Sequence, residues 1–355
     1  MQNVNIADLV RPNIRALEPY SCARSEFKGE AQIFLDANEN PYGVYNRYPD
    51  PLQVKVKEKI AKIKGVRPEQ IMLGNGSDEP IDLVYRIFCR PGVDNAVAMC
   101  PTYGMYKVAA DINDVEYREA MLVEETFELL PERMLALADE NTKVMWVCSP
   151  NNPTGNLIAP EAIETLLDKF GGILVVDEAY IDFSSKPSWL KRLDEFPRLI
   201  VLQTFSKAWG MAGVRCGMAF ASEEVISIFN KVKYPYNVNI LTQNAVSKAL
   251  DDEWASLCHT GFLVQERKRL EECLSNLPIV ERVYPSDANF LLVKVKNADA
   301  TYAALLEKGM VTRNRNKVKL CHGCLRITVG NDNENDAIIC DLLALGHRDD
   351  LMLAR

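Results

Sequence analysis

The chain has 355 residues, 48% of them hydrophobic types, so it is long enough to bury one large core and a second, smaller one. Its 41 lysines and arginines stand against 49 acidic residues, a formal net charge of −8, and no basic run could follow a nucleic-acid backbone. No apolar stretch reaches the roughly 18 residues that span a bilayer. Nucleic acid and membrane are therefore not expected as partners.

The first quarter of the chain alternates strands, turns and helices. Residues 33–35 predict a short strand that runs into a loop at 38–43, where proline and glycine end regular structure. Residues 52–64 mix apolar side chains with lysines at helical spacing and predict an amphipathic surface helix. A strand at 70–73 follows, and the loop GNGSD then leads into another helix.

From residue 95 to 220, apolar runs of strand length alternate with helical patterns. The runs are AVAMC, KVMWVC, GILVVDEA, LIVLQTF and CGMAFA. This alternation predicts a parallel sheet with crossover helices, and strands that are apolar throughout are typical of burial on both faces.

The pattern changes after a long helix predicted at 253–277. Strands FLLVKV and CLRITVG then flank the helix TYAALLEK, and a last helix begins near residue 334. The expected fold class is α/β, with a large, mostly parallel sheet flanked by helices and a smaller α+β domain. We place the large domain at 46–255 and the small domain at 256–355, with residues 1–45 as an N-terminal arm that folds back on the small domain.

Functional side chains of an open parallel sheet lie where strands end and helices begin. One such junction, Thr204-Phe205-Ser206-Lys207, places a lysine directly after two hydroxyl residues, and Arg215 follows as a second cation. A lysine amine becomes a nucleophile when burial or a neighbouring cation lowers its pKa, and hydroxyl groups with an arginine can hold a phosphate. Taken alone, such a lysine is more often a solvated loop residue.

Three other junctions carry polar residues of the same kind. Asp177 ends a strand and can pair with a protonated ring nitrogen, although helix capping explains a lone acid equally well. The loop at Gly76 offers free amides of a helix N-terminus to a phosphate, and the rigid turn SPNNPTG can point Asn152 at a ligand. Tyr103 offers an aromatic face. Each is an ordinary turn or packing residue by itself, but together they indicate one shared ligand.

The segments SPNNPTG, VVDEAY, SKAWGMAGVRCG and GNGSDE resemble the signature segments of fold-type I aminotransferases of classes I and II. Within that group, ANENPYG, RYPDP, PTYGMY, TRNRNK and GCLRITVG are similar to the histidinol-phosphate aminotransferases. The resemblance implies a homodimer that uses pyridoxal 5′-phosphate (PLP). It also implies transfer of the amino group of L-histidinol phosphate to 2-oxoglutarate, which gives 3-(imidazol-4-yl)-2-oxopropyl phosphate and L-glutamate in histidine biosynthesis.

The resemblance also implies a role for each candidate residue. Lys207 is the Schiff-base lysine and general base, Asp177 faces the pyridine nitrogen, and Asn152 and Tyr180 bond the ring oxygen. The remaining cofactor contacts implied are Gly76, Ser77, Asp78, Tyr103, Thr204, Ser206 and Arg215, with Tyr48 from the partner subunit. The substrate contacts implied are Tyr20, Arg313 and Arg326, since an arginine fork matches a carboxylate or a phosphate.

Other readings of the same motifs stay open. An aromatic aminotransferase or a phosphothreonine decarboxylase would carry similar segments, and a noncatalytic PLP-binding regulatory protein would share the fold. The pair Cys321 and Cys324 has the spacing of metal or redox sites, but no second pair completes a zinc site and no metal is expected. The ten scattered cysteines and the absence of a secretory signal fit the reducing cytoplasm.

Overall fold

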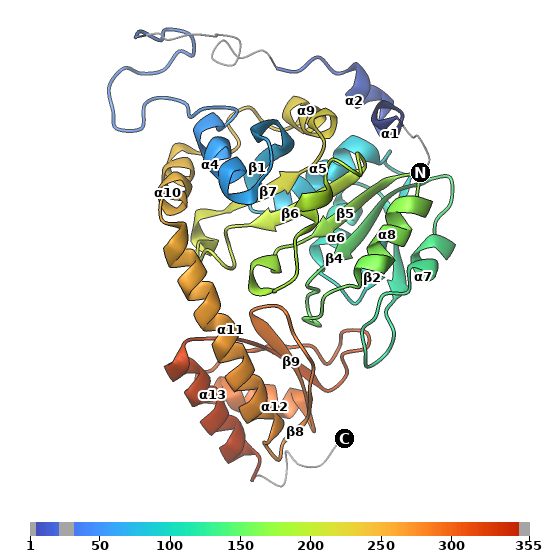
Figure 1. Ribbon diagram of the computed structural model, residues 1–355, viewed down its shortest axis with the longest axis vertical. Helices are drawn as coiled ribbons and strands as arrows, with labels where there is room; N and C mark the ends of the chain where they lie inside the picture. Colours follow the sequence, from blue (N-terminus) through green and yellow to red (C-terminus); the bar gives the residue numbers. More distant parts are fainter. Residues whose placement is uncertain (1–4, 21–31, 348–355) are drawn as a thin grey trace.

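The computed structural model describes residues 5–20 and 32–347, whose strands form two separate sheets (Figure 1). The seven-stranded sheet has the order β1-β7-β6-β5-β4-β2-β3, and the four-stranded sheet has the order β10-β11-β9-β8. The strands of the large sheet are β1 (Ile71–Asn75), β2 (Asn95–Cys100), β3 (Glu116–Met121), β4 (Thr142–Cys148), β5 (Ile173–Asp177), β6 (Leu199–Thr204) and β7 (Cys216–Phe220). The predicted α/β class is confirmed.

The parallel arrangement was predicted correctly for β2, β4, β5 and β6, but not for β7. Strand β7 runs antiparallel to both β6 and β1. Its connection from β6 contains only the 3-10 helix η4 (Ala212–Val214) and no crossover α-helix, which a parallel return would need. Strand β3 was not predicted, because the sequence EYREAM is polar and lies at the sheet edge.

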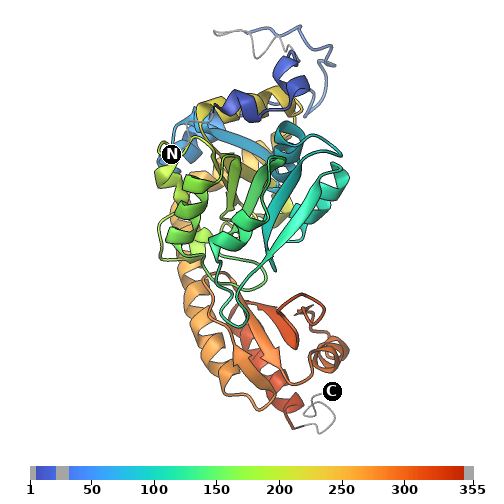
Figure 2. The same cartoon turned by 90° about the vertical axis from the view of Figure 1, so that its right-hand side faces the viewer.

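Helices cover both faces of the large sheet (Figures 1 and 2). One face packs against α4 (Val54–Lys64), α7 (Pro131–Ala136), α8 (Pro160–Lys169) and α10 (Ile240–Leu250). The other face packs against α5 (Asp78–Phe88), α6 (Met105–Ile112) and α9 (Glu223–Val232). Buried strands between two helical layers explain the apolar runs.

The N-terminal residues differ from the prediction. Helices α1 (Ile6–Leu9) and α2 (Pro12–Ala16) lie against the large domain, where Ile6 and Val10 join the core formed by α5 and α9. The Arg11 guanidinium donates to the carbonyl of Arg86 at 2.9 Å, and Lys231 donates to the carbonyl of Arg15 at 2.9 Å. The predicted strand at 33–35 is irregular and exposed, because no neighbouring strand pairs with it.

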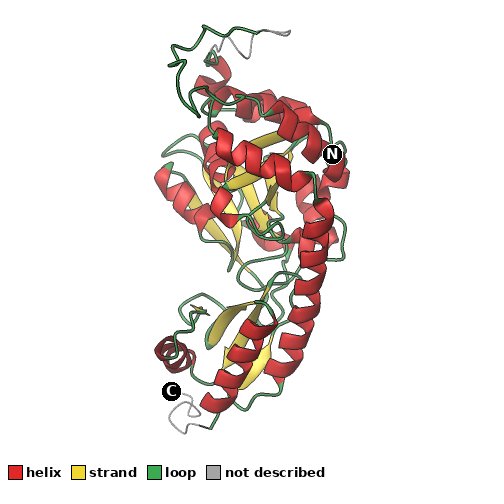
Figure 3. Cartoon of the chain, turned by 90° about the vertical axis from the view of Figure 1, so that its left-hand side faces the viewer, coloured by secondary structure: helices red, strands yellow, loops and turns green. Residues whose placement is uncertain are grey.

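The small sheet and the second half of α11 (Glu253–Ser275) form the small domain. Figure 3 shows α11 running from one sheet to the other along one side of the molecule. The other elements are β8 (Val280–Val283), β9 (Phe290–Val295), α12 (Ala298–Glu307), β10 (Arg313–Asn314), β11 (Cys324–Thr328) and α13 (Asp332–Leu345). Leu270 and Leu274 of α11 enter the small domain's own core, so this helix belongs structurally to both parts.

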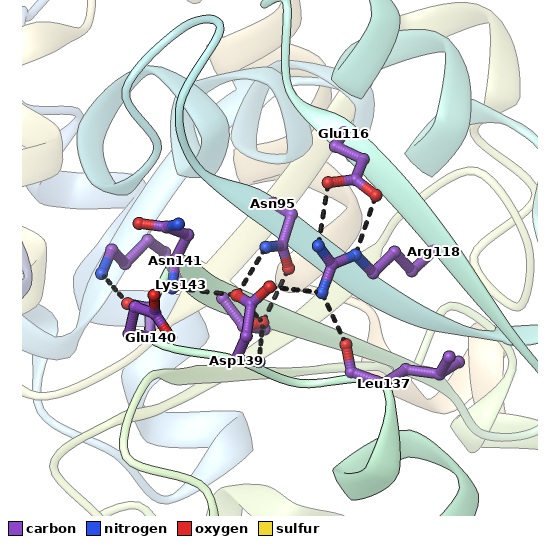
Figure 4. Close-up of polar contacts among 9 residues, drawn as sticks. Asn95, Glu116, Arg118, Leu137, Asp139, Glu140, Asn141 and Lys143 are labelled. Atoms are coloured by element: carbon purple, nitrogen blue, oxygen red, sulfur yellow. Dashed lines mark hydrogen bonds and ion pairs between the residues drawn. The ribbon is translucent and has the colours of Figure 1, made fainter.

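Polar side chains close the amino-terminal edge of the large sheet (Figure 4). Asp139 accepts hydrogen bonds from Asn95 and from Arg118, each at 2.8 Å, and these contacts hold the pKa of its carboxyl well below the usual range. Asn95 begins β2, so this network fixes the strand at the end remote from the carboxyl termini. The opposite edge is left for the candidate site.

Candidate active site

A cavity of about 700 Å³ lies at the carboxyl ends of the central strands, between the large and the small sheet. Strand ends and helix starts of the large domain supply one wall, and β10 and β11 supply the other. The predicted residues that line this cavity are Ser77, Asp78, Tyr103, Asn152, Asp177, Tyr180, Thr204, Ser206, Lys207, Arg215, Arg313 and Arg326.

Lys207 is half-buried in the cavity. Burial lowers the pKa of its amine, and the nearby Arg326 guanidinium lowers it further. Its Nζ lies 5.6 Å from the centre of the Tyr180 ring. A lysine with a lowered pKa is more often neutral at physiological pH, and the neutral amine is the nucleophilic form.

Asp177 ends β5 and is buried beneath the cavity. Its carboxylate accepts from the Tyr106 hydroxyl at 2.5 Å and from the Ala179 amide at 3.0 Å. Burial raises the pKa of this carboxyl above its ordinary value. Among residues 5–20 and 32–347, no cationic side chain forms an ion pair with Asp177, so the site has a buried acid that a cationic ligand atom would stabilise.

Tyr106 was not identified from the sequence. It lies one helical turn after Tyr103, is fully buried, and stacks on Trp146 with ring centres 4.7 Å apart. A buried tyrosine on an amphipathic helix is normally a core residue, and nothing in its sequence context distinguishes it. Only the fold shows that its hydroxyl holds Asp177.

The start of α5 and the segment after β6 face each other as an anion cradle. Gly76 has φ of +69°, and a Cβ there would lie 2.4 Å from Nη2 of Arg215, so glycine permits the guanidinium to approach. The Thr204 hydroxyl donates to that of Ser206 at 3.0 Å, and Arg215 lies 3.5 Å from the Asp78 carboxylate. Free helix amides, two hydroxyls and one guanidinium suit a phosphate.

Hydrogen bonds link Asn152 and Tyr180 to Arg326 of the small domain. Asn152 donates from Nδ2 to the Tyr180 hydroxyl at 3.2 Å, and Arg326 donates from Nη1 to Oδ1 of the same asparagine. Tyr103 donates to Asp78 at 3.1 Å. A single amide therefore joins the tyrosine that follows β5 to an arginine on β11.

Arg313 and Arg326 are register partners in the β10–β11 pair and both line the cavity. The structure adds Arg315, which lines the same cavity and was not identified from the sequence. Its signal was the two-residue spacing in TRNRNK, which places Arg313 and Arg315 on one face of a strand. No carboxylate pairs with these three guanidinium groups within the described ranges.

Two predicted tyrosines lie outside the cavity of the single chain. Tyr48 is 50% exposed and stacks on Tyr236 with ring centres 4.5 Å apart. Tyr20 is 75% exposed. Their predicted roles need a rearranged arm or a second chain, and they stay predictions.

The Cys-x-x-Cys motif contains two buried thiols. Cys321 and Cys324 are buried free thiols, and burial raises the pKa of each to about 12. Within 5–20 and 32–347, no group of three or more His, Cys, Asp or Glu side chains could hold a metal ion. None of the helices in the same ranges is both long and apolar enough to cross a membrane.

The profile of the family described as aminotransferase class I and II matches residues 30–343. A histidinol-phosphate aminotransferase of Parabacteroides distasonis is 56% identical over 94% of this chain and 97% of its own length. One of Bacteroides thetaiotaomicron is 52% identical over 95% of this chain and 98% of its own length.

Solved structures of low identity share the fold. A histidinol-phosphate aminotransferase of Clostridium acetobutylicum has a TM-score of 0.78 at 23% identity and covers 87% of this chain and 98% of its own. The Sinorhizobium meliloti enzyme, in complex with pyridoxal-5′-phosphate, has a TM-score of 0.76 at 22% identity, covering 84% and 83%. An L-threonine-O-3-phosphate decarboxylase of Porphyromonas gingivalis has a TM-score of 0.72 at 22% identity, covering 85% and 91%.

Proposed function

The chain belongs to the aminotransferases of classes I and II and, within them, to the histidinol-phosphate aminotransferases. On that premise we propose that it transfers the amino group of L-histidinol phosphate to 2-oxoglutarate, giving 3-(imidazol-4-yl)-2-oxopropyl phosphate and L-glutamate. One observation carries the proposal. A half-buried lysine and a buried carboxylate share one cavity with three arginines that lack acidic partners in the described residues.

The cofactor that we propose is PLP, and the residues present fit it. The buried Asp177, which forms no ion pair with a side chain of the described residues, suits a protonated ring nitrogen, and the cradle of Gly76, Ser77, Thr204, Ser206 and Arg215 suits a phosphate. When bound, PLP supplies an electron-withdrawing ring that stabilises negative charge at the substrate carbon. Lys207 would hold it covalently, Tyr103 would cover one face of the ring, and Asn152 with Tyr180 would bond its oxygen.

Lys207 would act as the proton carrier of the reaction. Its lowered pKa leaves part of the amine neutral, so that Nζ can take the proton from the substrate Cα. Asp177 would keep its charge toward the ring nitrogen because Tyr106 and the Ala179 amide both donate to it. Lys207 would thus carry the proton of the substrate carbon, while the Asp177 carboxylate would stabilise the proton on the ring nitrogen.

The arginines of the small domain would bind the anionic end of each substrate. Arg326 faces the cavity close to Lys207 and can take a carboxylate through its planar fork. Arg313, its register partner, would add a second cation for a phosphate. The imidazole side of the substrate has no assigned partner in the cavity, since Tyr20 lies outside it.

We propose a homodimer and a cytoplasmic location as further parts of this function. Large apolar side chains are exposed in the arm, including Leu35 at 90% and Val44 at 87%, and Trp254 on α11 is exposed at 74%. Exposed apolar surface of this extent is typical of a covered interface. The nine cysteines within the described residues are free, which fits a reducing compartment.

A test of the proposal compares three amino donors with 2-oxoglutarate as acceptor. Histidinol phosphate is expected to be the best donor, phenylalanine a weak one, and phosphothreonine is expected to release no carbon dioxide. Borohydride treatment of the yellow holoenzyme should fix the cofactor on the peptide that contains Lys207. An inactive holoenzyme with histidinol phosphate would contradict the substrate, and a label on another peptide would contradict the cofactor site.

A further inference from the structure

One arginine of the cavity, Arg315, has no contact of its own assigned in the function proposed above. It lies in a segment where Arg313 and Arg315 alternate with Asn314 and Asn316, and side chains of a strand point alternately to opposite faces. The Arg315 amide donates to the carbonyl of Cys324 at 2.9 Å, so the pairing of β10 with β11 extends to this residue.

The two asparagines fix the direction of the two arginines. Asn314 and Asn316 donate to the two carboxylate oxygens of Asp299 on α12, at 2.7 and 2.9 Å. The amide of Gly323 donates to Oδ1 of Asn316 at 2.8 Å. With the asparagines held against α12, Arg313 and Arg315 turn to the opposite face, and both line the cavity.

Arg315 is the half-buried cation of this group whose side chain donates no hydrogen bond within the described ranges. Its Nε is buried and has no hydrogen-bond partner, and no carboxylate pairs with it in residues 5–20 and 32–347. Burial, followed by the charges of Arg326 and Arg313, lowers its pKa to about 10. Like charges gathered without an acid between them repel each other until an anion binds.

The other two arginines are less free to bind a doubly charged group. Arg326 donates from Nη1 to Asn152, although its Nε, like that of Arg315, is buried without a partner, and Arg313 is exposed, so water screens its charge. A phosphate monoester carries a charge of about −1.5 to −2 at neutral pH and three terminal oxygens, whereas a carboxylate carries −1 and is matched by one fork.

We propose that Arg315 is a specificity residue, which contacts the substrate phosphate and makes this cavity prefer a doubly charged phosphate to a singly charged carboxylate. The inference rests on the proposed function and names the residue that separates its two substrates. The α-carboxylate of glutamate needs only Arg326, and its side-chain carboxylate carries a single charge, so Arg315 contributes more to the phosphorylated amine than to the amino acid.

The test measures kcat and KM separately for histidinol phosphate and glutamate in Arg315→Gln, Arg315→Lys and Lys317→Gln. Lys317 is exposed, lies two residues away and does not line the cavity, so its variant removes one charge without changing the site. Arg315→Gln should lower kcat/KM for histidinol phosphate about 30-fold, mostly through KM, and that for glutamate less than about threefold. Arg315→Lys should recover part of the loss, and Lys317→Gln should change neither value.

A second measurement keeps the inference falsifiable if one variant folds poorly. Inorganic phosphate should inhibit the glutamate half-reaction of the wild type more strongly at pH 7.5 than at pH 5.5, because its dianion dominates above its second pKa near 7. This dependence should flatten in Arg315→Gln and in Arg315→Lys to a smaller extent. Equal losses for both substrates, or an unchanged phosphate inhibition, overturn the role of Arg315.

The outcome is distinguishable from a failure of the proposed function. If the wild-type holoenzyme turns over glutamate but not histidinol phosphate, the proposed donor is wrong, and phosphate inhibition of the glutamate half-reaction still reports on Arg315. If histidinol phosphate is a good donor and Arg315→Gln affects both substrates alike, the proposed function stands and the specificity role is wrong.

Discussion

Asp177 and Glu178 are adjacent, both buried, and placed in different surroundings. Asp177 lines the cavity and accepts from Tyr106 and from the Ala179 amide. Glu178 lies behind the cavity wall, where it accepts from Ser188, from the Trp189 amide at 2.7 Å and from Gln203 at 2.9 Å. Two neighbouring acids therefore have separable roles, one in chemistry and one in structure.

Asp177→Asn is expected to lower kcat by about 100-fold or more, because a neutral amide cannot stabilise positive charge on a ring nitrogen in a buried site. The amide keeps the size of the side chain and can still accept from Tyr106 or Ala179, so the cofactor should remain bound. Steady-state kinetics and the absorbance of the bound cofactor check the two expectations. Glu178→Gln, one residue away, is the matched control and should keep kcat within a few-fold of the wild type.

Glu178 predicts a pH dependence of stability. Burial raises the pKa of its carboxyl to about 7, above the value of an unfolded chain. The folded protein therefore holds this proton more tightly than the unfolded chain does. The proton's contribution to the free energy of unfolding is complete below about pH 4.5 and is lost as the pH rises through 7. The loss is at most about 3 kcal/mol.

Thermal unfolding of the wild type and of Glu178→Gln between pH 5 and pH 8 measures this effect. The melting temperature of the wild type should decline across that range, and the decline should be smaller in Glu178→Gln, which has no proton to lose. The same slope in both proteins would mean that Glu178 does not titrate in this range. Glu161→Gln, an exposed acid on α8, controls for the loss of a surface charge.

The sequence could predict the site residues that lie at strand ends. It could not predict the residues whose role depends on how the folded chain packs. Lys207, Asp177 and Asn152 were predicted because each lies at the end of a buried strand or in the turn that follows it. Tyr106 resembles any core tyrosine until the fold places its hydroxyl on Asp177. Arg315 resembles a surface residue until Asp299 holds the alternating asparagines away from the cavity.

At the scale of elements, the anion cradle depends on how closely β1 and β7 approach. Gly74 and Gly217 are register partners in this antiparallel pair. The Glu79 carboxylate on α5 accepts from the Asn75 amide at 2.6 Å and from Asn237 at 3.0 Å, and so holds the loop from the other side. The position of the loop amides is therefore set by a strand pair and a helix start together.

Gly217→Ala should weaken cofactor binding about tenfold or more, which corresponds to about 1.4 kcal/mol. A Cβ at this position would lie 2.3 Å from the backbone carbon of Gly76 and from the backbone nitrogen of Ser77, so the loop must shift. Titration of the apoenzyme with PLP, followed by absorbance, measures the dissociation constant.

Gly261→Ala on α11 is the matched control, because a Cβ there meets no atom within 4 Å. Its dissociation constant for PLP should equal that of the wild type. A Gly217→Ala enzyme with unchanged affinity would show that the loop amides do not hold the phosphate.

Helices and strands were predictable from the sequence where burial gave a regular pattern of apolar residues. The apolar runs gave β2, β4, β5 and β6, and the helical spacing gave α4 and α11. The edge strand β3 and the strand β10 have no such pattern, because EYREAM is polar and β10 has only two residues. The predicted direction of β7 was wrong, because an apolar run indicates that a strand is buried but not whether it runs parallel or antiparallel to its neighbours.

At the scale of the whole molecule, the site is divided between two sheets. The large sheet supplies Lys207 and Asp177, and the small sheet supplies the arginines. Ion pairs cross between them, such as Lys319 with Glu119 and Arg282 with Glu125, each at 2.5 Å. These pairs are exposed and contribute little to stability individually, whereas buried apolar side chains of the two parts pack together, such as Phe127 with Tyr284 and Tyr180 with Phe290.

The wild type is expected to have twice the mass of one chain in light scattering. Trp254 and Leu257 lie three residues apart on α11 and are exposed at 74% and 55%, so a partner chain has apolar surface to cover there. Charged variants, Trp254→Glu and Leu257→Glu, should shift the mass toward that of a single chain. Leu343→Glu on α13, a half-exposed site in the small domain, should leave the dimer intact.

Tyr48 gives the sharpest test of how two chains would cooperate, because it does not line the cavity of its own chain. If it completes the site of its partner, Tyr48→Ala and Lys207→Ala should each be poorly active alone. A mixed dimer of the two would then contain one intact site, built from Lys207 of one chain and Tyr48 of the other. Refolding an equal mixture should restore about a quarter of the wild-type activity, since half of the dimers are mixed and each has one working site. Activity that stays at the level of the separate variants would mean that Tyr48 serves its own chain or none.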